Sequence, residues 1–450
     1  MAQDFKAFLK QAASVVPSAR QQAWFDTEFY GFVHFGVNAY TGREWGDGKE
    51  DPAIFNPVDL DCDQWVAAFK SAGIRGAVLT AKHHDGFCLW PSKYTEHSVK
   101  NSPWKNGKGN VVREFTDACR RGGLKVGFYL SPWDRNSALY GTDAYNDYYK
   151  AQLTELLTEY GELFIVWFDG ACGEGPNGRK QVYDFDGYFE LVRKYQPDAV
   201  TFGGPDVAWI GNESGTSRFA QWAVIPGELN RHAPVQTGPG PLASEGDLSY
   251  MNAMMPDIGS LQNILYSKGL IFAGSEVDMS IRPGWFYHPD EEPHSLERLL
   301  KTYYTSVGGN ACFHLNVPPM PSGLFDPRDV KRLAELGDYL KDAFGRDLAE
   351  GATITRSGGP AQTTFEIELK EESEIRYVVL MENLATGQRV ESFVIYLQDQ
   401  YGRFYDAHYD TTIGHKRICA IHGRGRKHKR LKVFIASARD EVDMRSIQVY

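Results

Sequence analysis

Short apolar runs alternate with amphipathic segments between residue 30 and about residue 316. The runs lie at 30–38, 76–84, 125–133, 163–170, 199–204, 269–280 and 311–319. Each has the nearly continuous apolar character of a strand that is buried on both faces. Segments between them, such as 63–73, 110–123, 145–161 and 294–309, carry apolar residues at helical spacing. An alternation of strand and helix predicts a parallel sheet with helices outside it.

The number of runs favours a closed sheet. Seven strands are visible in roughly 300 residues, and we expect an eighth in the irregular stretch 220–268. No GxGxxG motif follows the first run, which disfavours an open dinucleotide-binding sheet. We therefore predict a (β/α)8-type barrel as the catalytic domain, over residues 1–345, which includes a last helix at 326–345.

The pattern changes after residue 345 to strands that alternate polar and apolar residues, with few helical segments between them. Examples are TTFEIELK, IRYVVLMEN, ESFVIYLQD and RLKVFIAS. This alternation predicts a C-terminal antiparallel β-sandwich over residues 346–450. The sandwich contains a basic cluster, HKRICAIHGRGRKHKR at 415–430. We interpret this cluster as a solvated loop rather than an anion-binding patch.

Composition excludes several classes of partner. The 450 residues carry a formal net charge of −10, which argues against nucleic-acid binding, and no stretch of 18 apolar residues suggests a membrane span. Six scattered cysteines form no CxxC pair and are expected to be free thiols. The first residues contain early charges and no apolar signal segment, so we expect a cytoplasmic protein, or a secreted or periplasmic one if a signal peptide has been removed. Oligomeric state is not predicted.

Polar and aromatic residues gather where the predicted strands end. They are His34, then Lys82, His83, His84 and Asp85, then Tyr129 and Trp133, then Trp167 and Asp169. The carboxyl ends of barrel strands form the active site in this fold. Imidazoles, aromatic rings and carboxylates together are typical of a site that binds sugar hydroxyls and packs on a sugar face. A structural histidine or a turn-capping aspartate remains the alternative at each single position.

Two carboxyl groups are candidates for glycoside hydrolysis. Asp169 ends the run LFIVWFD, and Trp167 lies on the same face of that strand because strand side chains alternate. Glu213 follows in DVAWIGNESGTS, where we expect Trp209 to desolvate it. An ordinary surface glutamate is the alternative reading. The same stretch matches a glycosylation sequon, which we discount because a glycan there would obstruct the site.

A metal centre is the competing reading of the histidines. His34, His83, His84 and Asp85 are all possible ligands of a divalent ion. Neighbouring residues of one strand point to opposite faces, so His83 and His84 cannot both be ligands unless the strand has ended. No HxH pair follows the first run. We therefore predict neither a metal nor a cofactor.

Six motifs together resemble the α-L-fucosidases of glycoside hydrolase family 29. They are GFVHFGVNAYTGREWGDG, TAKHHDGFCLW, GFYLSPWDR, WFDGACGEGPNG, WIGNESG and LNVPPMPSGLFDP. The resemblance implies a retaining exo-α-L-fucosidase that acts on a fucosylated oligosaccharide, with Asp169 as nucleophile and Glu213 as acid/base. It implies that the fucose ring is surrounded by His34, Glu44, Trp45, His83, His84, Tyr129, Trp167 and Trp285.

Two of these motifs refine the expectation. EWGDG and WIGNESG are similar to the family branch that prefers α-1,3/1,4-linked fucose on branched, Lewis-type oligosaccharides. Transfer of fucose to a sugar acceptor is then expected as a minor activity. A broad-specificity fucosidase and a catalytically silent fucose-binding protein are the alternatives.

Overall fold

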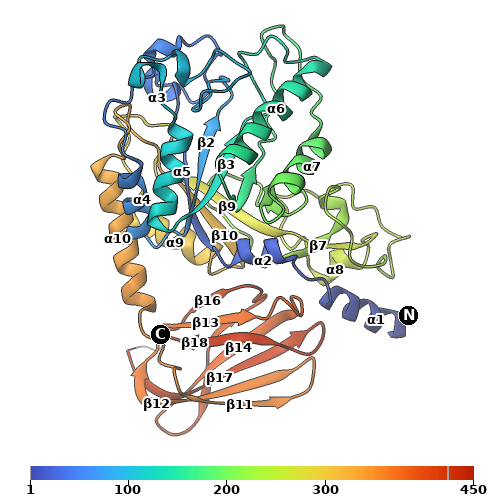
Figure 1. Ribbon diagram of the computed structural model, residues 1–450. Helices are drawn as coiled ribbons and strands as arrows, with labels where there is room; N and C mark the ends of the chain where they lie inside the picture. The colour runs from blue at the N-terminus through green and yellow to red at the C-terminus, as the bar shows by residue number, and fades with distance from the viewer. Residues whose placement is uncertain (1, 423–424) are drawn as a thin grey trace.

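The computed structural model describes residues 2–422 and 425–450. An eight-stranded, closed parallel barrel is followed by an antiparallel β-sandwich (Figure 1). The barrel strands are β1 (Phe29–Val33), β2 (Gly76–Lys82), β3 (Lys125–Leu130), β4 (Ile165–Trp167), β5 (Val200–Phe202), β6 (Val207–Trp209), β9 (Gly274–Ser280) and β10 (Ala311–Asn316). The predicted (β/α)8-type barrel with a C-terminal sandwich is confirmed.

Helices surround the barrel. The larger ones are α4 (Cys62–Ser71), α5 (Val111–Gly122), α6 (Asp143–Glu159), α7 (Phe185–Tyr195), α9 (Leu296–Ser306) and α10 (Pro327–Phe344). Short ones are α3 (Asn38–Thr41) and α8 (Leu261–Ile264), and α1 (Ala2–Ala13) and α2 (Ala19–Phe25) precede the barrel. Local sequence fixes their ends: the Asn110 side chain accepts a hydrogen bond from the Arg113 backbone N–H at the start of α5, and Gly123 ends it in a left-handed conformation. None of the described helices is long and apolar enough to cross a membrane.

The eighth barrel strand does not lie in 220–268. It is β6, only three residues long, and it pairs with β5 and β9. The stretch 220–268 instead contributes β7 (Val224–Pro226), which pairs antiparallel with β8 (Leu270–Phe272) outside the barrel. The run 269–280 is therefore two strands rather than one, because the chain leaves the small β7–β8 sheet and enters the barrel at Gly274.

The sandwich consists of two packed sheets. One has the order β11 (Thr353–Gly358), β12 (Thr363–Glu374), β17 (Lys427–Ala438), β14 (Val390–Gln398) and β15 (Phe404–Asp410). The other has β16 (Arg417–Ala420), β13 (Tyr377–Glu382) and β18 (Met444–Val449). Their inward residues form one continuous apolar core. The alternation seen in the sequence thus becomes a sheet with one buried face.

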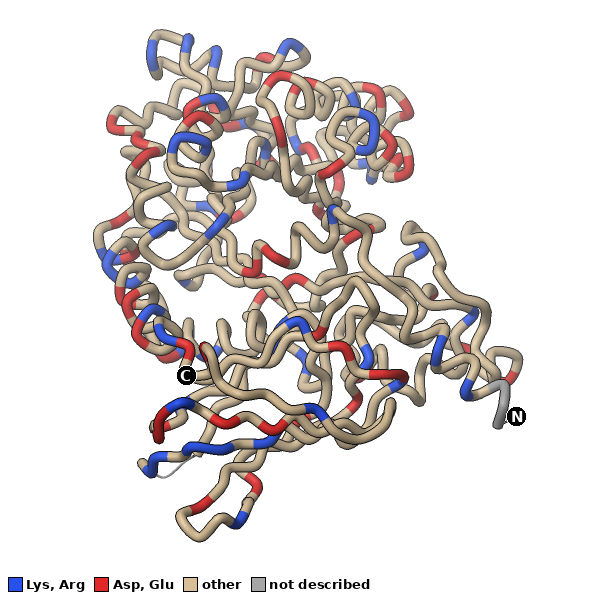
Figure 2. Tube along the Cα trace, turned by 60° about the horizontal axis from the view of Figure 1, so that its bottom comes forward, with Lys and Arg blue, Asp and Glu red and all other residues tan. Residues whose placement is uncertain are grey.

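The basic cluster at 415–430 is not one patch. His415 and Lys416 lie at the contact with the barrel, and the residues from Lys427 onward belong to β17, where Arg430 and Lys432 pair with Glu366. Residues 423–424 lie outside the described part of the chain. Figure 2 shows basic and acidic residues distributed over both domains. Several charges of this segment are therefore paired locally, and the expectation of a single solvated loop is wrong, because the segment contains β16 and the start of β17.

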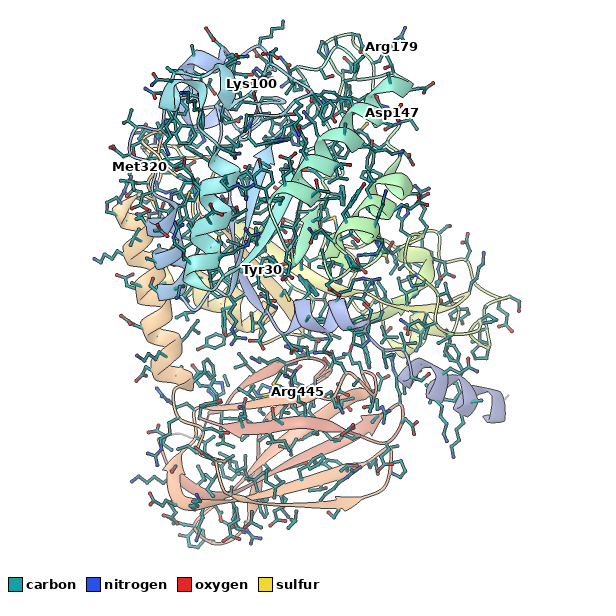
Figure 3. All side chains as sticks on the ribbon, in the orientation of Figure 1. Tyr30, Lys100, Asp147, Arg179, Met320 and Arg445 are labelled. Atoms are coloured by element: carbon teal, nitrogen blue, oxygen red, sulfur yellow. The ribbon has the colours of Figure 1, made fainter. Side chains whose placement is uncertain are left out.

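The sandwich docks on the amino-terminal end of the barrel, below α2 in Figure 1. Its contacts are made by residues that precede barrel strands: Glu28 pairs with His415 and Lys416, and the Asn310 side chain accepts from the His415 backbone N–H at 2.7 Å. Figure 3 places Arg445 on the sandwich face turned toward the barrel, where it pairs with Asp26 at 2.7 Å. The opposite, carboxyl-terminal end of the barrel stays open.

Replacing Glu28 by glutamine is expected to weaken this docking contact. Burial raises the pKa of Glu28, but hydrogen bonds and charges from His415 and Lys416 outweigh this and lower it from 4.5 to about 2. A carboxyl with a depressed pKa in the folded state stabilises the protein above the unfolded pKa and loses that contribution as the pH falls. Glu28→Gln should lower the free energy of unfolding by about 3 kcal/mol at pH 7.

Denaturant unfolding of wild type and variant between pH 7 and pH 2 checks this. The difference should shrink as the pH falls from about 4.5 toward 2. Glu371→Gln, at an exposed position on β12, is the matched control and should leave stability unchanged. A Glu28→Gln difference that does not vary with pH would contradict the ion-pair account.

Candidate active site

One cavity of about 540 Å³ opens at the carboxyl-terminal end of the barrel strands. All ten residues proposed from the sequence line it: His34, Glu44, Trp45, His83, His84, Tyr129, Trp167, Asp169, Glu213 and Trp285. They come from loops after β1, β2, β4, β6 and β9 and from β3 and β4 themselves. The fold therefore brings together side chains that are up to 251 residues apart, Trp285 and His34 being the extremes.

Asp169 is held firmly at the cavity wall. Its Oδ2 accepts a hydrogen bond from the Tyr129 hydroxyl at 2.8 Å, and its Oδ1 accepts from the Ala171 backbone N–H at 2.7 Å. The side chain remains about a quarter exposed, at 25%. Both oxygens are thus oriented by donors while the carboxylate still faces the cavity, which suits a nucleophile better than a buried cap.

Glu213 lies at the rim rather than in a desolvated position. The loop after β6 carries it, its side chain is exposed, and its Oε2 accepts from the Trp285 indole N–H at 3.1 Å. The expectation that Trp209 desolvates Glu213 is therefore wrong, because the loop stands open to solvent and Trp209 donates its own indole N–H to Asp278. Glu213 nevertheless shares one cavity with Asp169.

Three neutral imidazoles line the cavity. Burial lowers the pKa of His34 to about 3 and of His84 to about 4, and it lowers the pKa of His83 well below its usual value. β2 ends at Lys82, so the side chains of His83 and His84 need not point to opposite faces, and both line the cavity. Lys82 itself turns away and pairs with buried Asp134 at 3.1 Å.

Hydrogen bonds fix the tautomers of two of these rings. His34 Nδ1 lies 2.9 Å from Asn316 Oδ1, an atom that can only accept, so Nδ1 carries the proton and Nε2 is an acceptor. His84 Nδ1 lies 2.7 Å from Ser131 Oγ, which donates its own proton to the Trp133 carbonyl. The His84 Nδ1 therefore donates, and its Nε2 also faces the cavity region as an acceptor, 3.9 Å from Asp169 Oδ2. Nε2 of each ring can therefore accept a hydrogen bond from a hydroxyl group.

A buried carboxylate supports the floor of the cavity. Glu276 accepts from the Trp167 indole at 2.8 Å, from the Tyr30 hydroxyl, and contacts His314 Nδ1 at 3.0 Å. Figure 3 labels Tyr30 within the barrel below the strand ends. The Trp167 ring in turn stacks on Phe202, with ring centroids 3.9 Å apart. This network fixes an apolar floor, so that a ligand enters from one side only.

The family follows from comparison with known proteins. The α-L-fucosidase family model matches residues 2–343, which is well over half of the chain. The chain belongs to the α-L-fucosidase family.

Individual relatives of this fucosidase agree over most of its length. It is 39% identical to α-L-fucosidase 1 of Arabidopsis thaliana over 90% of this chain and 81% of that protein. A solved structure from Bacteroides ovatus has a TM-score of 0.90 at 42% identity and covers 99% of this chain and 76% of that one. The Ruminococcus gnavus family 29 fucosidase in complex with fucose has a TM-score of 0.81 at 28% identity, over 97% of this chain and 95% of that one. α-L-Fucosidase activity is thereby supported.

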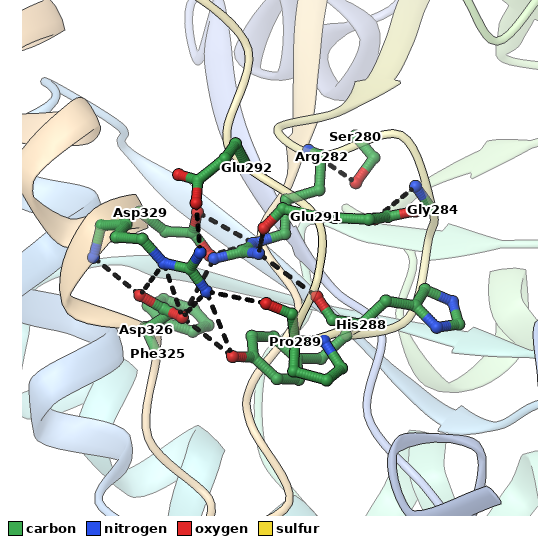
Figure 4. Close-up of polar contacts among 12 residues, drawn as sticks. Ser280, Arg282, Gly284, His288, Pro289, Glu291, Glu292, Phe325, Asp326 and Asp329 are labelled. Carbon is green, nitrogen blue, oxygen red and sulfur yellow. Dashed lines mark hydrogen bonds and ion pairs between the residues drawn. The ribbon is translucent and has the colours of Figure 1, made fainter. Parts of the chain in front are cut away.

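Buried Arg282 holds the loop that carries Trp285 (Figure 4). Arg282 is 1% exposed, its Nε donates to both oxygens of Asp329 at 3.0 and 2.8 Å, and its Nη2 lies 3.1 Å from Asp326 Oδ2. Nη1 donates to the Glu291 carbonyl of the same loop. Asp326 belongs to the LNVPPMPSGLFDP motif, which thus serves the site by anchoring this loop rather than by facing the cavity.

Glu44 joins this loop to the one after β1. Its Oε2 accepts from the Trp285 backbone N–H at 2.9 Å, and its Oε1 lies 2.7 Å from His288 Nε2. Next to it, Trp45 is 59% exposed, with its ring 5.6 Å from Trp133. Glu44 and Trp45 were both proposed as ligand-binding residues. The structure adds a positioning role for Glu44 through Trp285.

We expect Arg282→Met to lower the free energy of unfolding by about 3–5 kcal/mol, because it leaves the buried carboxylate of Asp329 without its cation, whereas Asp326 keeps Arg328. Thermal or denaturant unfolding measures the loss. Arg298→Met, an exposed arginine on the helix that follows, is the matched control and should change stability little. Equal stability of Arg282→Met and wild type would show that Asp329 finds another partner.

Several lining residues escaped sequence reasoning, namely Phe32, Phe202, Trp209 as a wall residue, and Asp278. Phe32 and Phe202 look like any buried strand residue, so nothing in the sequence distinguishes them. Asp278 did carry a signal, because Glu276 and Asp278 alternate within an otherwise apolar run, and alternate acids on a barrel strand face the barrel interior. Among residues 2–422 and 425–450, no group of three or more His, Cys, Asp or Glu residues is arranged to hold a metal ion.

Proposed function

We propose that this fucosidase is a retaining exo-enzyme that releases α-1,3/1,4-linked fucose from branched, Lewis-type oligosaccharides. The observation that supports this most is that Asp169 and Glu213 line one cavity. Both oxygens of Asp169 are oriented by hydrogen-bond donors, and Trp167 and Phe202 close the cavity below. A cavity with a closed floor admits a terminal sugar but not an internal one. This geometry favours exo action.

In the first step, Asp169 Oδ attacks the anomeric carbon of fucose, and the bond from that carbon to the leaving oxygen breaks. Glu213 gives its proton to the leaving oxygen, so no free alkoxide is formed. The product is a covalent fucosyl ester of Asp169. The Tyr129 hydroxyl, 2.8 Å from Oδ2, holds the attacking carboxylate in place before the ester forms.

In the second step, Glu213 takes a proton from water, and the resulting hydroxide attacks the anomeric carbon from the side that the leaving sugar vacated. The ester bond breaks, Asp169 leaves as a carboxylate, and two inversions give net retention. A sugar hydroxyl in place of water yields fucose transfer as a minor reaction. Neither step changes an oxidation state, and all the proton transfers are made by Glu213 and water.

The neutral histidines and the aromatic walls account for fucose recognition. Nε2 of His34 and of His84 are acceptors for two sugar hydroxyls, as their tautomers require. The apolar rings of Phe32 and Trp285, 6.2 Å apart, provide a surface for the sugar's methyl group. The linkage preference rests on the EWGDG and WIGNESG motifs, which supply exposed Trp45 and Glu213 at the cavity rim.

Proton NMR of the enzyme with a Lewis-a-type trisaccharide tests this proposal. α-Fucose appearing before mutarotation, together with no release from an α-1,2-fucosyl trisaccharide, is the expected result. β-Fucose first would overturn the nucleophilic role of Asp169. Equal release from both trisaccharides would favour a broad-specificity fucosidase, and no release from any fucoside would favour a silent fucose-binding protein.

A further inference from the structure

Trp209 is a fixed aromatic side chain for which the mechanism above has no use. It ends β6, is 38% exposed, and its indole N–H donates to Asp278 Oδ1 at 3.0 Å. Asp278 lies on the neighbouring strand β9, is 2% exposed, and also lines the cavity. The buried acceptor holds the Trp209 side chain in one rotamer before any ligand binds, so binding need not order this ring.

The chemistry of Asp278 suits a positioning role. Burial, with the charge of neighbouring Glu276, raises the pKa of Asp278 well above its ordinary value. This shift favours the protonated carboxyl, which can accept at one oxygen and donate from the other. Its Oδ1 accepts the indole N–H at 3.0 Å, so this buried side chain orients the Trp209 ring.

The position of Trp209 corresponds to the leaving side of the reaction. Glu213 must reach the glycosidic oxygen to protonate it, so the leaving sugar extends across the rim that Glu213 occupies. Trp209 stands four residues before Glu213 and borders the same cavity. On its other side lies a second hollow of about 320 Å³, lined in part by Asn230, Arg231 and His232. Trp209 and Gly203 line both hollows, so the Trp209 ring lies where the two hollows meet.

We propose that Trp209 is a specificity-determining residue on which the leaving sugar packs, that Asp278 is its positioning residue, and that the hollow beyond it receives the next part of the oligosaccharide. This inference rests on the proposed function. The ligand is a neutral sugar whose C–H face covers the indole, and the side chains beyond it offer hydrogen-bond donors to sugar hydroxyls. Such a platform strengthens binding of an oligosaccharide but not of a fucoside that lacks a leaving sugar.

The experiment compares two substrates, a Lewis-a-type trisaccharide and α-L-fucosyl fluoride, which has no leaving sugar. For Trp209→Ala, the ratio of kcat/KM on the trisaccharide to kcat/KM on the fluoride should fall at least tenfold. Asp278→Leu should lower the same ratio, since the indole loses its acceptor. Asp278→Asn, whose amide also accepts and donates, should restore it to within about twofold of wild type. Phe219→Ala, at a 68% exposed aromatic residue that does not line the cavity, is the control.

Each outcome decides the matter. Equal losses on both substrates for Trp209→Ala would place Trp209 with the fucose ring and overturn the inference, and no loss on either would also overturn it. A ratio for Asp278→Asn as low as that for Asp278→Leu would overturn the positioning role of Asp278. A wild-type protein that hydrolyses neither substrate would instead contradict the proposed function, which keeps the two failures distinct.

Discussion

Asp169→Ala is expected to lower kcat on a fucosyl oligosaccharide by about 10⁴-fold or more, because the variant has no group that can form the fucosyl ester. The fold should persist. Asp169 is partly exposed and accepts hydrogen bonds from one loop amide and one hydroxyl, so its removal leaves little buried and unpaired. Steady-state kinetics and circular dichroism together measure the loss and the retained fold.

Azide provides a sharper test of the nucleophile. In Asp169→Ala the proposed nucleophile is gone, so we expect a small anion to attack the anomeric carbon from the same side. Its product, β-fucosyl azide, has the inverted configuration. Formation of the α-azide would assign another role to Asp169. A folded variant whose turnover azide does not restore would do the same.

Glu213→Gln is expected to lower kcat on the trisaccharide by about 10²- to 10⁴-fold, because glutamine cannot give a proton to the leaving oxygen. The amide conserves size and can still accept from the Trp285 indole, so the geometry of the rim is kept. The first chemical step on α-L-fucosyl fluoride should suffer far less, since fluoride leaves without protonation. Stopped-flow detection of fluoride release separates this step from the later hydrolysis of the ester.

The control for this variant is another exposed glutamate on the barrel. Glu297→Gln, in the first turn of α9, removes one negative charge near the mouth without touching the cavity and should keep wild-type kinetics. An equal fall in the release of fluoride and of sugar by Glu213→Gln would mean that Glu213 binds substrate rather than transferring protons.

The barrel could be predicted because most of its strands are buried on both faces. β2, for example, is a run of seven residues that are all buried. β6 was missed because three residues, one of them exposed Trp209, give no periodicity to recognise. The sequence also gave no reason to place a break at Gly274, because both β8 and β9 are buried throughout. Only pairing with different neighbours distinguishes them.

The site could be predicted where polar residues interrupt apolar runs at strand ends, as His34 and Asp169 do. What the sequence could not show is how these residues are held. Nothing in it indicated that Glu44 bonds the Trp285 loop or that Trp285 contacts Glu213, because those partners are separated by 241 and 72 residues. Such contacts depend on the closure of the barrel rather than on local spacing.

The docking of the sandwich at the amino-terminal end of the barrel has a consequence for how such an enzyme can change over generations. Substitutions at the contact of Glu28 with His415 and Lys416 are expected to alter the stability of the folded protein. Substitutions in the loops after the strands are expected to alter which glycans it binds. The two ends are separated by the length of the barrel, so their effects should add independently. A lineage can therefore change its substrate range by substitutions in the loops after the strands. Substitutions at the sandwich contact can then restore the stability that was lost.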